Sequence, residues 1–151
     1  MDKLKDYSMA VKFFNKVAYE STNCGDQWKS PYLHLRRMQC YSELIGIAPD
    51  AYLNAQDAIS SFNSVVPLLD PSTKNNAMCQ YRYLKGQLMY KEYNNLCDKK
   101  KKGSSPTLVK KINKEMKTLR SDAIKYIEDY ENQIGDCSSM SNELDNLKDG
   151  C

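Results

Sequence analysis

A short sequence pattern occurs twice in the chain and constrains its fold more than any other feature. Residues 10–18 read Ala-Val-Lys-Phe-Phe-Asn-Lys-Val-Ala, and residues 58–66 read Ala-Ile-Ser-Ser-Phe-Asn-Ser-Val-Val. In both copies Ala, Phe and Val stand at positions i, i+4 and i+7, which lie on one face of an α-helix. A fainter third copy places Ala123, Ile127 and Tyr130 at the same spacing. Repetition of one helical unit predicts a stack of helices.

Turn-forming residues divide the chain into five predicted helices, and no segment has the pattern of a β-strand. We expect the helices to cover about residues 3–20, 31–46, 51–69, 75–96 and 108–134. Pro67 is expected to kink or end the third helix, because proline cannot donate the helical hydrogen bond. The lysine-rich segment 97–106 predicts a mobile loop. The polar tail 136–151 is expected to be weakly structured or to form one short helix.

The predicted helices alternate between two types. The copies of the repeated pattern fall in the first, third and fifth helices, whereas the second and fourth are rich in tyrosine. This alternation predicts an all-α fold over residues 1–135, in which antiparallel helix pairs stack as a right-handed, tetratricopeptide-like solenoid of about five helices. The helices that carry the repeated pattern correspond to the second helix of each pair, and the chain begins with such a helix, so its partner is missing at the front. The sequence therefore predicts a segment of a longer array, or an atypical helix at the front.

Composition limits the class of protein. The chain has 151 residues, of which 41% are apolar and 27% charged, so it can bury a core and is not expected to be disordered. It contains no apolar run near the ~18 residues that span a bilayer, and its first residues lack the apolar stretch of a signal peptide. These features predict a cytoplasmic protein without a membrane span.

The six cysteines allow two interpretations. Their spacing is irregular and several occupy apolar helical positions, which favours reduced thiols in a cytosolic protein. The alternative is a secreted helical ligand or effector held by three disulfides, because the number of cysteines is even. Counting free thiols in the denatured, unreduced chain separates the two. The cysteines are Cys24, Cys40, Cys79, Cys97, Cys137 and Cys151.

Catalytic residues are not predicted. His34 is the only histidine, which excludes metal sites and catalytic dyads that need two, and Cys40 lies on a different helix face from it. The sequence contains no Cys-x-x-Cys motif, no glycine-rich phosphate loop and no His-Glu-x-x-His motif. We therefore expect a protein that is not an enzyme and that binds no cofactor or metal.

Two resemblances suggest the kind of protein. The stretch from Ala58 to Phe62 followed by Leu68-Leu-Asp-Pro71 resembles the second helix of a tetratricopeptide repeat, although the copies are spaced more widely than in standard repeats. Among relatives with longer helices, the chain is similar to the C-terminal helical region of the kinesin-binding protein family. The matching stretches are residues 9–14, 67–71, 83–87, 108–113 and 121–126. The resemblance implies a non-enzymatic scaffold that binds kinesin motor domains and is associated with the cytoskeleton.

Aromatic residues of the fourth predicted helix are the first candidates for a partner surface. Tyr81, Tyr83, Tyr90 and Tyr93 cannot all face one side of a helix, so one or two of them should be exposed. Exposed aromatic residues are enriched at protein interfaces. The secondary candidates for partner binding are Arg36, Arg37 and Arg82.

Lysines give the last third of the chain a strong charge polarity. Residues 97–120 carry nine basic residues against two acids, whereas residues 121–151 carry two against eight. The simplest interpretation is a solvated loop and helix face. A sharper one is contact with an acidic partner, nucleic acid or anionic lipid, although no aromatic residue is interleaved for base stacking, which disfavours nucleic acid. The candidate anion contacts are Lys99, Lys100, Lys101, Lys102, Lys110 and Lys111.

Overall fold

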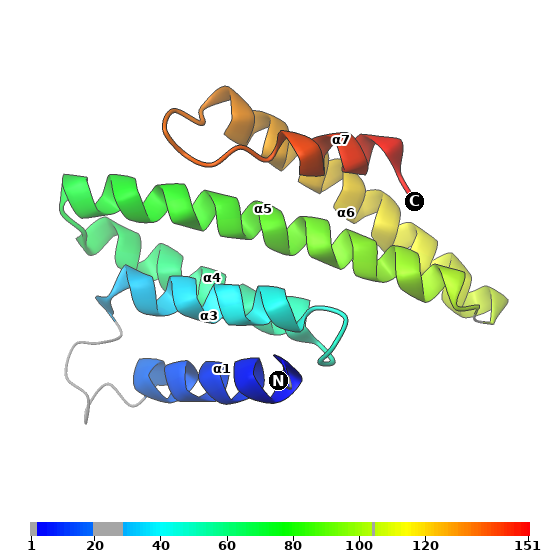
Figure 1. Ribbon diagram of the computed structural model, residues 1–151, viewed down its shortest axis with the longest axis horizontal. Coiled ribbons are helices and arrows are strands. Elements are labelled where there is room, and N and C mark those ends of the chain that lie inside the picture. Colours follow the sequence, from blue (N-terminus) through cyan, green and yellow to red (C-terminus); the bar gives the residue numbers. More distant parts are fainter. Residues whose placement is uncertain (1–2, 20–28, 104) are drawn as a thin grey trace. The chain divides into compact units, whose positions relative to one another are not determined.

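The computed structural model describes residues 3–19, 29–103 and 105–151, and every regular element in these ranges is helical. This confirms the predicted all-α class. The α-helices are α1 (Lys3–Tyr19), α3 (Pro31–Leu44), α4 (Ala51–Val65), α5 (Pro71–Lys101), α6 (Pro106–Asn132) and α7 (Ser141–Asp149), and the short 3-10 turn η2 (Val66–Leu68) follows α4 (Figure 1).

The chain folds into two compact units, residues 1–85 and residues 86–151. The boundary falls inside α5, a continuous helix, so no linker composition marks it in the sequence. The single repeat domain predicted over residues 1–135 spans this boundary.

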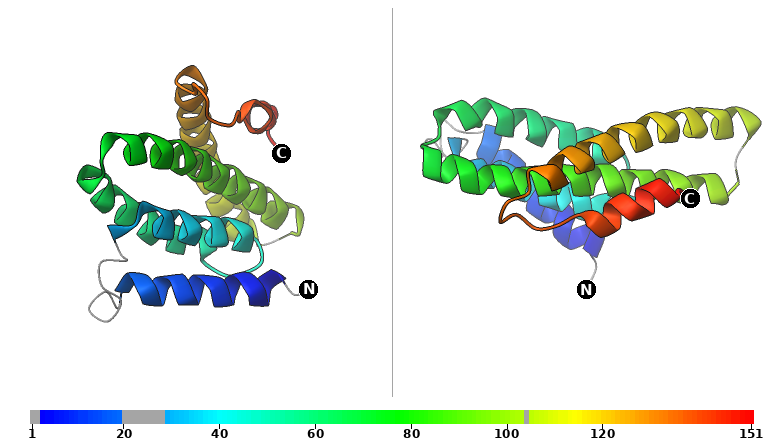
Figure 2. Two further views of the ribbon diagram at one scale, coloured as in Figure 1. Left: turned by 60° about the vertical axis from the view of Figure 1, so that its left-hand side comes forward. Right: turned by 90° about the horizontal axis from the view of Figure 1, so that it is seen from above.

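The first unit is built around α3, which packs against both α1 and α4. Figures 1 and 2 show α1 running along α3, with the opposite side of α1 facing away from the other helices of this unit. Proline starts α3 at its first position, where its missing N–H costs no hydrogen bond. The short turn η2 contains Pro67 and ends α4, as the sequence predicted.

The repeated pattern forms buried helix faces in α4 and α6. In α4 the side chains of Ala58, Phe62 and Val65 are fully buried, and the ring of Phe62 stacks on Tyr81 with centroids 4.4 Å apart and planes 6° from parallel. In α6 the three matching residues, Ala123, Ile127 and Tyr130, are also buried. Burying each large apolar side chain contributes about 1.5–3 kcal/mol, so these faces anchor the two cores.

Helix α5 extends beyond both of its predicted ends. It begins at Pro71, where the Asp70 carboxylate accepts hydrogen bonds from the Thr73 N–H (3.0 Å) and hydroxyl (2.7 Å). These bonds lower the pKa of Asp70. It ends at Lys101, so most of the lysine run is helical and the predicted loop over residues 97–106 is wrong for its first half. Lysine is a good helix former, and its positive charge is favourable at a helix C-terminus.

In the second unit, α7 packs against α6. Leu147 and Met140, the residue just before α7, are fully buried. The guanidinium of Arg120 donates to the backbone oxygens of Leu147 and Lys148, both at 2.6 Å. These contacts hold the tail as a short helix, the second of the two forms predicted for residues 136–151.

Disulfide bonds differ from the favoured prediction of reduced thiols. Cys97 near the end of α5 is bonded to Cys151, and Cys79 and Cys137 are disulfide-bonded as well. Cys40 is a free, buried cysteine, and burial raises the pKa of its thiol. Cys24 lies outside the described residues. The spacing of the cysteines along the sequence did not reveal these bonds, because it does not show which cysteines lie close together in the folded chain. Cys97 and Cys151, for example, are 54 residues apart in the sequence.

Gly86 gives a test of packing in the second unit. A Cβ atom at this position would lie 2.6 Å from Sδ and 2.9 Å from Cε of Met140, whose side chain is fully buried. We expect Gly86→Leu to lower the free energy of unfolding by about 2 kcal/mol, because overpacking forces neighbours out of their preferred rotamers. Chemical denaturation followed by circular dichroism measures this change.

The control for Gly86 is a double variant. Adding Met140→Ala to Gly86→Leu removes the atoms that the new side chain meets, so it should restore part of the lost stability. If the loss of unfolding free energy in the double variant equals the sum of the losses in the two single variants, the two side chains do not compete for the same space.

Candidate anion-binding surface

Two of the four candidate tyrosines on α5 are core residues. Tyr81 and Tyr93 were predicted as partner-binding residues, but they are only 6% and 4% exposed and cannot contact a partner. Tyr83 and Tyr90 are partly exposed, which agrees with the expectation that one or two of these tyrosines face away from Tyr81. The Tyr90 hydroxyl accepts a hydrogen bond from the side-chain amide of Asn146 at 2.9 Å.

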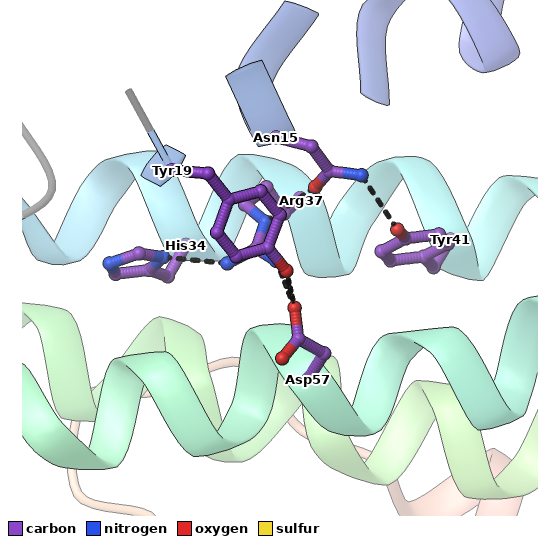
Figure 3. Close-up of polar contacts among 6 residues, drawn as sticks. All are labelled: Asn15, Tyr19, His34, Arg37, Tyr41 and Asp57. Carbon is purple, nitrogen blue, oxygen red and sulfur yellow. Dashed lines mark hydrogen bonds and ion pairs between the residues drawn. The ribbon is translucent and has the colours of Figure 1, made fainter. Parts of the chain in front are cut away.

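The three candidate arginines occupy different environments. Arg36 is exposed and bonds to Gln39 within α3, and Arg82 is partly exposed on α5. Arg37 is fully buried and forms the centre of a polar cluster in the first unit (Figure 3). The prediction of Arg37 as a surface residue for partner binding is therefore wrong. The other members of the cluster are Asn15, Tyr19, His34, Tyr41 and Asp57.

The contacts of Arg37 satisfy its guanidinium. Its Nη2 atom lies 2.6 Å from the Asp57 carboxylate and 3.0 Å from the Tyr19 hydroxyl, and its Nε atom donates to Asn15 at 2.7 Å. Nη1 donates to Nδ1 of His34 at 3.0 Å, so this ring nitrogen acts as the acceptor. Burial lowers the pKa of Arg37, but an arginine stays charged at any ordinary pH. This cluster joins α1, α3 and α4, which is a structural role.

The candidate lysines, in contrast, are all exposed. Lys99, Lys100 and Lys101 form the last turn of α5, and Lys102 follows directly. Helix α6 begins four residues later at Pro106, and the Ser105 hydroxyl caps it by accepting from the N–H of Leu108 at 3.3 Å. In the second unit, one group of lysines therefore lies at the C-terminal end of α5 and the other near the N-terminal end of α6.

A shallow hollow lies on the first turns of α6. Its lining contains four lysines and no acidic residue, and it is made by Thr107, Lys110, Lys111, Asn113, Lys114 and Lys117. We call this set the α6 lysine surface. The wall of the hollow is mostly aliphatic, because the stems of the lysine side chains form much of it, and the lysines carry ammonium donors at their ends. Several ammonium groups close together attract carboxylate, phosphate or sulfate groups.

Acidic residues are fewer in the first half of α6 than in the second. Glu115 is the one acid among residues 106–118, whereas Asp122, Glu128, Asp129 and Glu131 lie further along the helix. The last turn therefore carries acids where the helix dipole favours bases, whereas the lysines begin after the first turn, where the effect of the dipole has fallen off.

The sequence predicts Lys110 and Lys111 as anion contacts, whereas the polar residues Thr107 and Asn113 beside them were not among the predicted contacts. The spacing of 107, 110, 111, 114 and 117 follows the helical period and is the signal that groups them on one side. Within the described ranges, no group of three or more His, Cys, Asp or Glu residues is placed to hold a metal ion.

No protein-family model matches this chain, and comparisons with curated proteins and with solved structures found no match either. Among the described helices, none is both long enough and apolar enough to cross a membrane.

Proposed function

We propose that this protein is a non-enzymatic binding module whose α6 lysine surface binds an acidic segment of a partner protein. The observation that carries the proposal is a hollow lined by four lysines, two neutral polar residues and no acid. An acidic peptide places several carboxylates in reach of these ammonium groups and gains favourable electrostatic energy from each.

The lining favours an acidic peptide over nucleic acid. Proteins that bind single-stranded nucleic acid combine basic residues with aromatic side chains on which bases stack. The α6 lysine surface contains no aromatic residue. Its basic residues are lysines, whereas arginine is the residue that most often forms two parallel hydrogen bonds to a base edge or a phosphate. Lysine acts as a flexible point charge, which suits an acidic segment of variable sequence.

The architecture that we propose for this module is a stack of antiparallel helix pairs, as in a tetratricopeptide-like solenoid. The support is the repeated i, i+4 and i+7 spacing, which is buried as Ala, Phe and Val in α4 and as Ala, Ile and Tyr in α6. From the resemblance we add that a kinesin motor domain is one such protein partner and that the chain acts in the cytoplasm. Capture of a purified motor domain by the full chain tests this identity separately from the surface.

The binding experiment uses a fluorescein-labelled polyglutamate peptide of about 15 residues as the probe, with fluorescence anisotropy as the readout. We expect binding to weaken steeply between about 50 and 200 mM salt, because screening shortens the reach of charges to about 10 Å at 0.1 M. The variant Lys110→Glu/Lys114→Glu/Lys117→Glu should bind at least about tenfold more weakly, which corresponds to about 1.4 kcal/mol.

The matched control makes the same charge change outside the α6 lysine surface and outside α1. Lys29→Glu/Lys74→Glu/Lys125→Glu alters the net charge equally, at three exposed lysines. It should change the affinity for polyglutamate by no more than about twofold. Equal losses in the two triple variants would mean that net charge, and not this surface, attracts the peptide.

The disulfides support a second candidate function, a secreted helical ligand or effector. Disulfide bonds persist mainly in oxidising compartments, and at least four of the six cysteines are bonded. Thiol titration of the denatured, unreduced protein isolated from its source cells distinguishes the two settings. Six free thiols would exclude the secreted form, whereas two or fewer, with Cys40 among them, would exclude the cytosolic one.

A further inference from the structure

The three copies of the repeated pattern are not buried equally. In α4 and α6 the residues at i, i+4 and i+7 are between 0% and 5% exposed. In α1 the matching residues, Ala10, Phe14 and Val17, are only partly buried. The same pattern that forms a helix contact elsewhere in the chain is therefore incompletely covered in α1.

Two large apolar residues extend this incompletely covered face. Met9 and Phe13 are 61% and 62% exposed, and they lie one helical turn apart on the side next to the partly buried residues. We call Met9, Ala10, Phe13, Phe14 and Val17 the α1 outer face. Helix α1 packs on α3, and Figures 1 and 2 show its far side directed away from the other helices of the first unit.

Basic residues line one edge of this face, and one acid lies at its N-terminal end. The exposed Asp6 lies three residues before Met9, whereas Lys12 and Lys16 are exposed and lie three residues after Met9 and Phe13. An antiparallel pair of α1 helices packed on this face would bring the lysines of the two copies together, which disfavours that pairing. An acidic residue on an incoming helix would instead meet them at the edge of the apolar contact.

We infer that the α1 outer face is a docking site for an amphipathic helix of a partner protein, with an apolar stripe that covers Phe13 and Val17 and acidic residues that face Lys12 and Lys16. Helices commonly recognise one another through such i, i+4 and i+7 anchors. Ala10 permits close approach, as the matching Ala58 does in the core, where it is fully buried. This inference is independent of the α6 lysine surface, because it concerns the first unit alone.

The test uses two labelled peptides of about 20 residues, long enough to hold helical structure. Both carry leucine at i, i+3, i+4 and i+7; one has glutamate at the flanking positions and the other has lysine. With the full chain, we expect saturable binding of the glutamate peptide and at least about tenfold weaker binding of the lysine peptide. Anisotropy titration measures both.

Variants of exposed residues locate the binding without disturbing the fold. Met9→Glu/Phe13→Glu should abolish binding of the glutamate peptide, whereas Lys12→Glu/Lys16→Glu should reverse the preference so that the lysine peptide binds more tightly. Lys74→Glu/Lys125→Glu is the control at two exposed lysines outside both proposed surfaces, and it should leave the affinity unchanged. Circular dichroism confirms that each variant keeps its helix content.

Several results would overturn the inference. They are the absence of saturable binding, equal binding of the two peptides, and unchanged binding by Met9→Glu/Phe13→Glu. A concentration-dependent dimer that this variant abolishes would show that a second copy covers the face instead. None of these results bears on polyglutamate binding to α6, so failure here and failure of the proposed function are distinguishable.

Discussion

Replacing Cys97 and Cys151 together by alanine is expected to lower the stability of the second unit by about 4 kcal/mol. The bond closes a loop with a sequence separation of 54 residues, and removing such a cross-link restores much conformational freedom to the unfolded chain. The bond also joins the end of α5 to the residue that follows α7. We therefore expect α7 to lose the most protection.

Hydrogen exchange measured by mass spectrometry reads this effect locally. Amides of α7 should exchange roughly a thousandfold faster in the double variant, since each 1.4 kcal/mol is a factor of ten. Cys40→Ala serves as the control, because it changes a buried thiol of the first unit and should leave exchange in α7 unaltered. Unchanged α7 exchange in the double variant would show that α6 holds this helix without the disulfide.

The second large effect concerns the buried charge of Arg37. Its side chain is 0% exposed while that of Asp57 is 55% exposed, so only the arginine depends on its partner for compensation. We expect Asp57→Ala to destabilise the first unit by about 1–2 kcal/mol, because the buried guanidinium loses its charged partner, while solvent already screens the exposed carboxylate. Arg37→Met should cost less, since it removes the charge and keeps an apolar side chain of similar length.

Urea denaturation of the full chain, followed by circular dichroism, compares these variants. Asp57→Asn separates charge from hydrogen bonding, because it keeps an acceptor for Arg37 and should lie between the wild-type chain and Asp57→Ala. The neighbouring exposed residue Gln56 provides a control, and Gln56→Ala should change stability by less than about 0.5 kcal/mol. A greater loss in Arg37→Met than in Asp57→Ala would show that packing of the arginine outweighs its charge.

Local features of the fold were predictable from the sequence. Pro31 starts a helix and Pro67 lies in the turn that ends one, as predicted, because proline acts on its own backbone and that of its neighbours. Pro71 also starts a helix, which the sequence predicted to begin only at about residue 75. Gly103 adopts a positive φ of 76° in the turn after the lysine run, as a glycine readily does. The end of α5 was harder to predict, because the polar lysine run has high helix propensity and the composition of a loop.

Some features of the candidate sites were also predictable from the sequence, and others were not. The exposure of Lys99–Lys102 and Lys110 follows from composition, since lysine rarely leaves water. The burial of Arg37 could not be predicted, because it depends on Asp57 from α4 and Asn15 from α1 arriving at one point of α3. No pattern within α3 encodes the positions of those two residues.

The helical class, most of the helix ends and the shared face of positions i, i+4 and i+7 in each copy of the pattern could be read from the amino-acid sequence. Those properties arise within a few residues along the chain. Long-range packing sets the burial of this face in α4 and α6, its incomplete cover in α1 and the bond between Cys97 and Cys151. Burial and disulfide pairing depend on which distant segment packs against a residue, and helical periodicity carries no information about that segment.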